Sequence, residues 1–554
     1  MPAERVAVVC IDPWTAHGSD YRPFNYSARK VLAAVMAAPE LKGVKTQLIE
    51  TGDPNAAELA RRIEAFAPDV LGFSAYVWSF ATMLEIAAQV RRSLPETLIV
   101  FGGPSARPEM FALPPYRPFV PVVDALVPGE GEVTFPRLCA LSDRSEVAKV
   151  PGLAVPMGTG FRSTGEPELP DLSKLASPYA LGLVEPGSTA HLESFRGCPL
   201  SCSFCQWGDE RDSSRVFPEE VLRAELEQFE RLKMSGVYLV DAALNLSARA
   251  FKGLHAALKD SALWGRARLR TEIYPSNLTE MHLEVLAGAK AEAVGIGLQS
   301  FDEDVLDGVE RPFDAKRFER VVADVAAIVP ETTVEIILGL PGDTPENFKR
   351  TVQRAKSLPT ELRVFRCLVL PGALMSRAAP DAALEYDPVT LEMQSCKGWS
   401  REALAEAVEW VDREAHAAGG ERNGRAIWRF PRPGAGPVGG RSVVSEAKAA
   451  GVPSVAPRLL ELIGGAVQRG SSAAWRVQDV ERRGETVSVV IEAGEAPLRV
   501  TIERAKAGRA SFRVVGELAF SYGVVPAAPT AGQLVVLDQV IQSLGAALAA
   551  EPLQ

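Results

Sequence analysis

Short apolar runs alternate with amphipathic stretches along residues 1–145. The runs have the length and β-branched content of buried strands, and stretches such as AAELARRIEAF between them carry apolar residues at helical spacing. The runs are RVAVVCI, TQLIE, VLGFSA, LIVFGG and DALVPG. Because strands that alternate with helices form parallel sheets, this pattern predicts a doubly wound, Rossmann-like α/β domain.

The ends of four of these runs carry small and turn-forming residues, at positions 12–18, 74–78, 102–104 and 129–132. Ligands of doubly wound sheets bind outside the carboxyl ends of the strands, and small residues there let the backbone approach a large ligand. The pattern indicates a nucleotide-scale binding domain. The alternative is a loop glycine at each strand end with no ligand.

A second α/β series follows a connector rich in proline and glycine. The connector covers residues 146–185 and ends in PDLSKLASPYALG, where turn-forming residues replace periodicity. The predicted strands of residues 186–385 are AHLESFRG, GVYLVDA, RLRTEIY, EAVGIGLQS, TVEIILGL and LRVFRCLVL, with helical patterns near 218–233, 248–258, 279–288, 315–328 and 345–356. Six βα units with right-handed crossovers predict an open, partial TIM-like (β/α)6 barrel, with its active site at the carboxyl ends of the strands.

Residues 386–554 carry weaker patterns. In the segment 386–441 we expect a helix at about 401–418, followed by GGERNGRAIWRFPRPGAGPVGGRS, which has the composition of a flexible linker. Residues 442–554 predict a helix, three or four strands such as TVSVVIEA and PLRVTIER, and a closing helix LDQVIQSLGAALAA. We interpret this last segment as a small α+β cap or substrate-docking domain.

Charge and hydropathy exclude several classes of protein. Lys and Arg total 60 against 70 Asp and Glu, so the net charge is −10, and without a long basic run nucleic acid is not an expected partner. The first residues lack the features of a secretory signal, and no apolar run approaches the roughly 18 residues that span a bilayer. We therefore expect a soluble, cytoplasmic protein that does not bind membranes.

Three of the seven cysteines lie in the segment RGCPLSCSFCQWG, after the first predicted barrel strand. Cys198, Cys202 and Cys205 have the spacing C-x3-C-x2-C, which differs from the four-cysteine run of ferredoxins and from paired CxxC zinc sites. Three thiolates on an iron–sulfur cluster leave one iron open. That iron can chelate the amino and carboxylate groups of S-adenosylmethionine and pass an electron into its sulfonium. The alternative is a zinc site completed by His191.

The motif C-x3-C-x-aromatic-C, with Phe204 as the aromatic residue, resembles the signature of radical S-adenosylmethionine (SAM) enzymes. The resemblance covers roughly residues 186–380, where TEIYPSNLTEMHLEVLAGAKAEAVGIGLQSFDEDVL and VEIILGLPGDTPENF are similar to segments of the subgroup with the coproporphyrinogen-dehydrogenase-like core. It implies a [4Fe–4S] cluster held by the three cysteines, SAM, and an electron donor such as a flavodoxin or ferredoxin.

The same resemblance assigns roles to residues at the strand ends. Phe204 would lie by the adenine of SAM, and Gln299 and Ser300 would approach its ribose. The adenine side would be lined by Gly339, Leu340 and Gly342. The segment VDAALN departs from the glycine-glycine-glutamate pattern that usually holds the methionine amino group, so Asp241 and Asn245 are the candidate substitutes.

Glu272 lies near the end of the third predicted barrel strand and faces the mouth of the barrel if side chains alternate. It could bind the ribose or the amino group of SAM. It could instead ligate the open iron, which would redirect the chemistry away from radical initiation, or form a structural ion pair.

The predicted N-terminal domain resembles the cobalamin-binding domain of cobalamin-dependent radical SAM enzymes, on the segments VLGFSAYVW, IVFGGPSARP and LVPGEGEVTFPRL. The resemblance implies that Ser74 hydrogen-bonds the dimethylbenzimidazole tail of cobalamin or its phosphoribosyl arm. Gly102 and Gly103 would let the tail lie against the backbone. The turn that would flank it consists of Gly129, Glu130, Gly131 and Glu132.

The Asp-x-His-x-x-Gly signature of proteins that ligate cobalt by histidine is absent, because Asp12, His17 and Gly18 have the wrong spacing. The resemblance then implies base-off cobalamin without a lower histidine ligand, although His17 stays an alternative. The residues expected beneath the corrin are Tyr76, Val77 or Trp78, and the other interpretation of the two aromatic residues is a packed core.

Together the two resemblances predict a cobalamin-dependent radical SAM methyltransferase, which moves a methyl group from SAM through methylcobalamin to a carbon of a small-molecule or peptide-derived substrate in natural-product biosynthesis. Three alternatives stay open. They are polar methylation if Glu272 blocks the open iron, ring contraction or cyclisation without methyl transfer, and a degenerate N-terminal recognition module. The pocket-facing Arg366 and the turn at Pro371 and Gly372 do not identify the substrate.

Overall fold

The computed structural model of the chain describes residues 2–12, 23–52, 54–207, 215–423, 427–434, 475–483, 486–493, 496–504 and 510–514. The chain forms two compact units. The first consists of residues 1–362 and 366–407, and the second of residues 363–365 and 408–554.

The N-terminal part of the first unit contains a seven-stranded sheet with the order β2-β1-β3-β4-β5-β6-β7. The first five of these strands are parallel, which confirms the predicted doubly wound fold. The strands are β1 (Arg5–Ile11), β2 (Lys45–Thr51), β3 (Val70–Ser74), β4 (Leu98–Gly102), β5 (Ala125–Val127), β6 (Ala154–Met157) and β7 (Gly160–Ser163).

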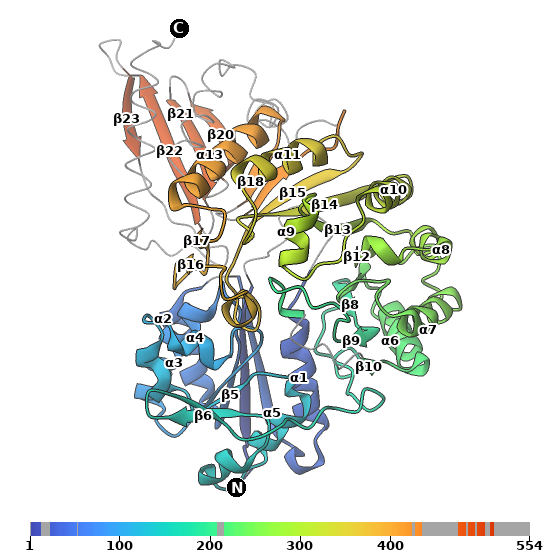
Figure 1. The fold of residues 1–554 in the computed structure, drawn as a ribbon. Helices are drawn as coiled ribbons and strands as arrows, with labels where there is room; N and C mark the ends of the chain where they lie inside the picture. Colours follow the sequence, from blue (N-terminus) through green and yellow to red (C-terminus); the bar gives the residue numbers. More distant parts are fainter. Residues whose placement is uncertain are drawn as a thin grey trace. The chain divides into compact units, whose positions relative to one another are not determined.

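Helices cover both faces of this sheet, with α1 and α5 on one side and α2, α3 and α4 on the other (Figure 1). Alternate residues of β1 enter the two cores: Val6 and Val8 pack with α1 and α5, whereas Ala7 and Val9 pack with α2 and α3. The helices are α1 (Tyr26–Ala37), α2 (Ala56–Phe66), α3 (Phe80–Ser93), α4 (Pro108–Ala112) and α5 (Gly131–Cys139).

The segment 146–185, which the sequence predicts as a connector, contains the hairpin β6–β7. β6 pairs antiparallel with β5, so the hairpin extends the sheet on its β5 side. Glycine and proline around the hairpin, such as Gly152 and Pro167, mask its short strand pattern in the sequence.

The second α/β series forms parallel strands in the order β8, β11, β12, β13, β14, and its sheet is not closed. The first predicted strand is divided, because a bend separates β8 from β9. β9 leads into the cysteine loop and pairs antiparallel with β10. These strands are β8 (Thr189–Leu192), β9 (Phe195–Arg196), β10 (Arg215–Val216), β11 (Gly236–Leu239), β12 (Leu269–Ile273), β13 (Ala293–Gln299), β14 (Glu331–Leu338) and β15 (Glu361–Arg366).

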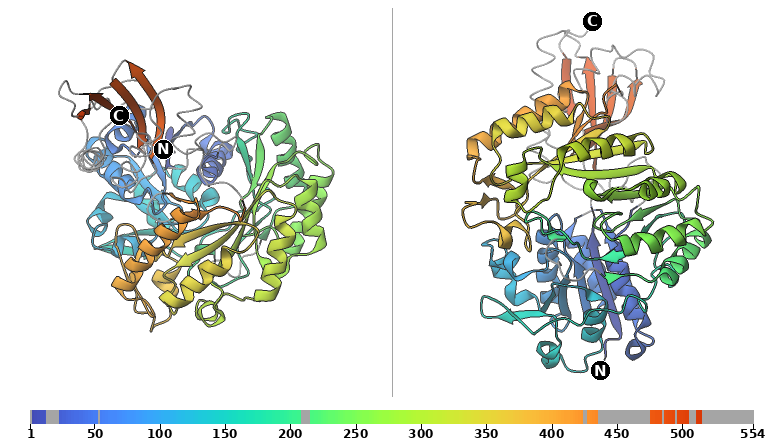
Figure 2. Two further views of the ribbon diagram at one scale, coloured as in Figure 1. Left: turned by 90° about the horizontal axis from the view of Figure 1, so that it is seen from above. Right: turned by 45° about the vertical axis from the view of Figure 1, so that its right-hand side comes forward.

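Helices lie on the outer side of these strands, which curve as in a partial barrel (Figure 2). They bury one amphipathic face each, as in α10, where Phe318, Val322 and Val325 are covered while the charged residues remain outside. The helices are α6 (Glu219–Arg231), α7 (Ala248–Lys259), α8 (Glu280–Gly288), α9 (Glu303–Gly308), α10 (Ala315–Ala326), α11 (Pro345–Ala355) and α12 (Leu374–Arg377). A small hairpin of β16 (Glu385–Tyr386) and β17 (Met393–Ser395) follows, and then α13 (Arg401–Ala417) at the predicted position.

The second unit contains antiparallel strands. The expectation of a flexible linker is wrong in part, because β18 (Glu421–Asn423) and β19 (Ile427–Phe430) pair within it, and the alternating Trp428 and Phe430 are buried. A meander of four strands follows, and it agrees with the predicted number: β20 (Trp475–Arg483), β21 (Thr486–Ala493), β22 (Ala496–Arg504) and β23 (Ala510–Val514). The two helices predicted around these strands fall outside the described residues. Among the described helices, none combines the length and apolar character needed to span a membrane.

Candidate active site

The three motif cysteines line one cavity of about 270 Å³ at the carboxyl ends of the barrel strands. Cys198, Cys202 and Cys205 are free thiols, the first two buried and the third partly exposed. Burial raises the pKa of Cys198 to about 11, so a metal centre must displace its proton to obtain a thiolate ligand. His191 is not among the residues that line this cavity, because its ring packs against Phe24. Three thiols without a disulfide around one cavity fit a three-thiolate cluster.

Two side chains fix the cysteine loop, Arg377 from later in the chain and Gln206 from the loop itself. Arg377 donates hydrogen bonds to the backbone oxygens of Ser201 at 3.3 Å, Cys202 at 3.2 Å and Cys205. Gln206 Nε2 donates to the backbone oxygens of Pro104, at 3.2 Å, and Pro371, at 3.0 Å. The loop is therefore bonded both to the N-terminal domain and to the segment that follows the last barrel strand.

Carboxylates from two strands reach the cavity beside glycines of the strand between them. Glu272 of β12 is the register partner of Gly295, and Glu335 of β14 is the register partner of Gly297. Both carboxylates line the cavity, as does Gln299 at the end of β13. A Cβ at Gly295 would overlap the carboxylate of Glu272, and one at Gly297 would lie 2.6 Å from Nε2 of Gln299. The two glycines thus make room for these polar groups.

Arg311 brings a buried positive charge to the same cavity, and no sequence pattern predicts this position. Its Nη1 lies 3.8 Å from Sγ of Cys202, and its Nη2 donates to the backbone oxygen of Gly297. The guanidinium also stacks over the ring of Tyr274 at 5.4 Å. Arg311 follows the end of α9 on a loop without a distinctive motif, so only the folded chain reveals that it lies beside a cysteine.

The predicted SAM-binding residues divide into two groups. Phe204, Gln299 and Glu272 line the cavity. The others are outside its lining: Asp241, Asn245, Ser300, Gly339, Leu340 and Gly342.

Asp241 and Asn245 instead hold strand ends together. Asp241 is buried and accepts hydrogen bonds from the backbone N–H of Ser194, at 2.8 Å, and from its hydroxyl. Burial raises the pKa of Asp241 to about 7. Asn245 donates to the backbone oxygen of Tyr274 at 2.6 Å and accepts from its N–H at 2.9 Å. These side chains fix the chain at the ends of β8 and β12, and β12 contributes Glu272 and Ile273 to the cavity wall.

The residues after β13 and β14 shape turns. Ser300 is fully buried and accepts a hydrogen bond from the N–H of Asp302 at 3.1 Å. Gly339 and Gly342 have φ values of +93° and +89°, which favour glycine, and Leu340 between them is fully buried.

A second cavity of about 250 Å³ lies at the carboxyl ends of the N-terminal sheet. Its floor is apolar and includes Val8, Phe73, Val100, Val127 and Phe135. The predicted cobalamin-binding residues gather on its wall: Ser74, Gly102, Gly103, Gly129, Glu130, Gly131 and Glu132.

Two glycines of this wall differ in what a side chain would meet. Gly103 has a φ of +91°, and a Cβ there would lie 2.8 Å from the backbone oxygen of Ala75. Gly129 has open space where a Cβ would stand. An apolar slot with a polar rim fits the flat dimethylbenzimidazole and its polar arm.

Tyr76, Val77 and Trp78 follow β3 but do not line this cavity. The rings of Tyr76 and Trp78 stack at 4.6 Å, and Trp78 is 42% exposed, so it is not core. Trp78 Nε1 donates to the backbone oxygen of Ile11 at 3.1 Å, whereas Val77 packs partly against the core. A stacked and half-exposed pair provides an apolar surface of the kind expected beneath a corrin. His17 and Gly18 lie outside the described residues.

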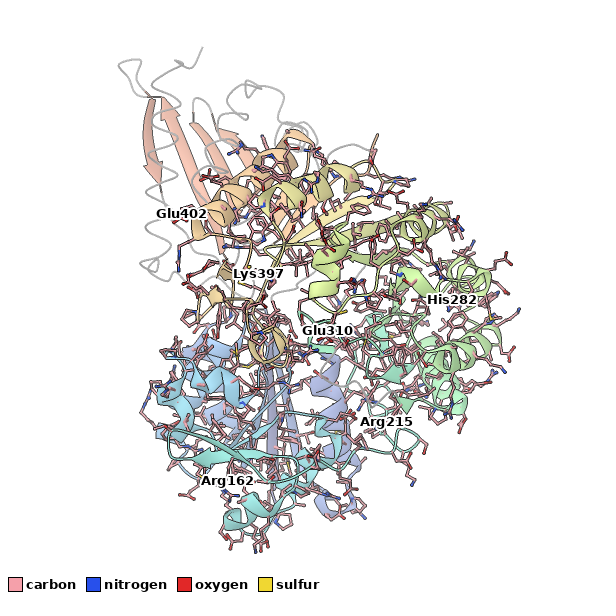
Figure 3. The ribbon with its side chains drawn as sticks, viewed as in Figure 1. Arg162, Arg215, His282, Glu310, Lys397 and Glu402 are labelled. Atoms are coloured by element: carbon pink, nitrogen blue, oxygen red, sulfur yellow. The ribbon has the colours of Figure 1, made fainter. Side chains whose placement is uncertain are left out.

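Ion pairs connect the wall of the second cavity to β9, the strand that leads into the cysteine loop. Arg196 on β9, two residues before Cys198, forms ion pairs with Glu132 at 2.6 Å, with Glu193 at 2.9 Å and with Glu130. Arg215, labelled in Figure 3, adds a second guanidinium to Glu130. The charges of Arg196 hold the pKa of Glu132 below its usual value despite burial.

Trp207 lines both cavities and is 43% exposed. It follows the third cysteine by two positions, so the same loop that carries the thiols also borders the N-terminal cavity. The two cavities are therefore neighbours within the first unit.

Comparison with known proteins matches both domains. Residues 192–355 match the family described as the radical SAM superfamily, and residues 29–139 match the B12 binding domain. The chain is 32% identical over 349 residues to the cobalamin-dependent radical SAM methyltransferase TokK of Streptomyces tokunonensis, covering 58% of this chain and 49% of the relative. It is 31% identical over 332 residues to the 2-(S-pantetheinyl)-carbapenam-3-carboxylate methyltransferase of Streptantibioticus cattleyicolor, covering 55% and 48%. The chain thus spans about half the length of these curated relatives.

Solved structures support the fold. The radical SAM methyltransferase TsrM from Kitasatospora setae, with cobalamin and a [4Fe–4S] cluster bound, superposes with a TM-score of 0.56 at 19% identity and covers 74% of this chain and 90% of that one. The cobalamin-dependent radical enzyme OxsB gives a TM-score of 0.51 at 14% identity, covering 85% and 68%.

Proposed function

Since the chain belongs to the radical SAM superfamily and also carries a B12 binding domain, we propose that it is a C-methyltransferase of natural-product biosynthesis. Its cofactors are a [4Fe–4S] cluster, SAM and cobalamin. The methyl group would pass from SAM, with cobalamin as carrier, to a carbon of a small molecule or peptide-derived substrate. When bound, the cluster supplies the electron that cleaves SAM, and cobalamin supplies a methyl carrier.

The observation that carries this proposal is the meeting of the two cavities at Trp207. Methyl transfer between a carrier and a substrate radical requires that both cofactors face a common space. Gln206 supports this arrangement, because it bonds the cysteine loop directly to Pro104 of the N-terminal domain.

The side chains around the cysteines suit SAM. Cys198, Cys202 and Cys205 would hold the cluster. The guanidinium of Arg311, permanently charged and buried beside Cys202, suits the carboxylate of SAM. Glu272, Glu335 and Gln299 line the same cavity and suit its ammonium and ribose hydroxyl groups, which donate hydrogen bonds.

One observation favours a second candidate, polar methylation. The carboxylate of Glu272 lies in the cavity that the three cysteines line, where it could supply a fourth ligand to the cluster. A capped iron would not cleave SAM reductively. Methyl transfer would then require an electron-rich carbon.

The test uses full-length protein reconstituted anaerobically with iron, sulfide and cobalamin, reduced with a flavodoxin system and given SAM with a deuterated methyl group. The first compound to try as substrate is 2-(S-pantetheinyl)-carbapenam-3-carboxylate, because it is named for a relative. Labelled product with stoichiometric 5′-deoxyadenosine supports radical methyl transfer. Labelled product without 5′-deoxyadenosine favours the polar route. A modified product without label contradicts methyl transfer and points to ring contraction or cyclisation.

A further inference from the structure

Lys30 places a buried ammonium in the N-terminal cavity. The residue is 5% exposed and lines the cavity with Tyr26, Ser27 and Val31. These positions lie on one face of α1, because residues four apart in a helix are neighbours. The face of α1 that borders the cavity therefore includes one cation.

Within the described part of the chain, neither a hydrogen bond nor an ion pair engages this ammonium. Its Nζ lies over the rings of Tyr26 and Phe217, at 5.7 Å and 5.6 Å from their centroids. Burial lowers the pKa of Lys30, although Glu193 and Glu132 oppose this shift from a distance. A buried charge without a direct partner is costly in a folded protein, unless a ligand supplies the partner.

The other cation that lines this cavity is Arg196, which already has carboxylate partners. Arg196 forms ion pairs with Glu130, Glu132 and Glu193, so its guanidinium is neutralised by carboxylates. Lys30 is therefore the cation of the cavity lining that remains available to an anionic ligand among the described residues.

The cavity lining combines apolar and polar side chains. Phe73, Val100 and Phe135 are apolar, whereas Ser27, Ser74 and Lys30 contribute hydroxyl and ammonium groups. The carboxylates of the lining, Glu130, Glu132 and Glu193, pair with Arg196. The nucleotide tail of cobalamin also combines apolar and polar parts, because a flat apolar base is joined through a ribose to a phosphodiester with one negative charge.

We propose that Lys30 binds the phosphodiester of the cobalamin nucleotide tail, with the base against the apolar side chains of the cavity. The inference rests on cobalamin binding, which is part of the proposed function, and it is independent of whether a methyl group is transferred. Lys30 thereby distinguishes complete cobalamin from corrinoids that lack the nucleotide.

The experiment compares two corrinoids on the full-length protein with its cluster reconstituted. Hydroxocobalamin and aquacobinamide, which lacks the nucleotide tail, are titrated separately and binding is followed by the corrinoid absorbance. For Lys30→Met, we expect cobalamin to bind about tenfold or more weakly, since a charge-assisted hydrogen bond is lost, and cobinamide to bind as it does to the wild type. Lys30→Arg retains most of the cobalamin affinity, and the exposed Lys42→Met is the matched control.

The outcomes separate this inference from the proposed function. Equal cobalamin affinity in the wild type and Lys30→Met overturns the role of Lys30, and so does an equal loss for both corrinoids, which would indicate damage to the pocket. Cobinamide binding that inorganic phosphate tightens equally in the wild type and in Lys30→Met would show that the phosphate group is bound away from Lys30, and overturns the assignment. A wild-type protein that binds neither corrinoid refutes cobalamin binding itself.

Discussion

Glu272 and Gly295 face each other as register partners on β12 and β13, and the carboxylate of Glu272 fills the space that a side chain at position 295 would need. The smallest residue on one strand thus admits a charged group from the next into the cysteine cavity. A substitution at position 295 can therefore displace the carboxylate of Glu272 while residue 272 itself stays glutamate.

Gly295→Ala is expected to displace the Glu272 carboxylate, because the added Cβ would overlap it. We expect SAM to bind about tenfold more weakly, the usual effect of losing one hydrogen bond to a charged group. Isothermal titration of the reconstituted protein measures this affinity. Gly308→Ala is the control, since open space surrounds that position. Unchanged SAM affinity in Gly295→Ala would show that Glu272 does not contribute to SAM binding.

Glu272→Gln separates the two roles of this carboxylate. If Glu272 binds SAM, the variant weakens SAM binding about tenfold, and the paramagnetic resonance spectrum of the reduced cluster without SAM stays that of the wild type. If the carboxylate instead caps the open iron, the spectrum without SAM changes on substitution. The radical route predicts the first result, and the second would favour polar methylation.

Arg196→Met removes the buried guanidinium that pairs with three largely covered carboxylates of the N-terminal cavity and the β8–β9 segment. We expect the free energy of unfolding to fall by about 3–5 kcal/mol, because Glu132 and Glu193, whose side chains are only 6% and 17% exposed, lose the cation that pairs with them. Arg137→Met is the matched control. Its ion pair with Glu168 is exposed, and we expect a cost of about 0–1 kcal/mol. Urea unfolding of both variants measures the difference, and equal costs would contradict a buried network.

Asp241 is expected to make stability depend on pH. Burial raises its pKa to about 7 in the folded chain, against about 3.9 when unfolded, so the unfolded state ionises first as the pH rises. The contribution of Asp241 to stability is thus complete below pH 4 and is lost progressively between about pH 4 and 7.

Asp241→Asn keeps an acceptor for the Ser194 N–H and a donor for its hydroxyl, but does not ionise. Relative to the variant, the wild type should lose on the order of 3 kcal/mol between pH 4 and 7. Unfolding midpoints across this range measure the loss, with the exposed Asp304→Asn as control. Parallel profiles of the wild type and Asp241→Asn would contradict a raised pKa.

Local patterns predicted the strands and helices of the first unit because both sheets are built from consecutive βα units. The alternation in RLRTEIY was sufficient to point Glu272 at the mouth, where it lies. By contrast, the hairpin β6–β7 and the pair β18–β19 are short and stand among glycines and prolines, so their pairing was not visible in the sequence.

Residues defined by tertiary packing were also missed. Arg311 contacts Cys202, which lies 109 positions earlier in the sequence. Lys30 lies on α1, whose amphipathic pattern is that of any surface helix. Asp241 and Asn245 were expected beside SAM, but they bond to the backbone at Ser194 and Tyr274. A resemblance by motif position does not reveal such hydrogen bonds, because they depend on how neighbouring strands end.

In the proposed function, cobalamin bound by the N-terminal domain accepts a methyl group from SAM. The most direct measurement needs no substrate: protein holding cluster and cobalamin is reduced, given SAM with a deuterated methyl group, and its corrinoid is extracted in the dark for mass spectrometry. We predict methylcobalamin that carries the deuterated methyl group, in an amount close to one per protein. Bound corrinoid without the labelled methyl group, in protein shown to bind SAM, would contradict the account.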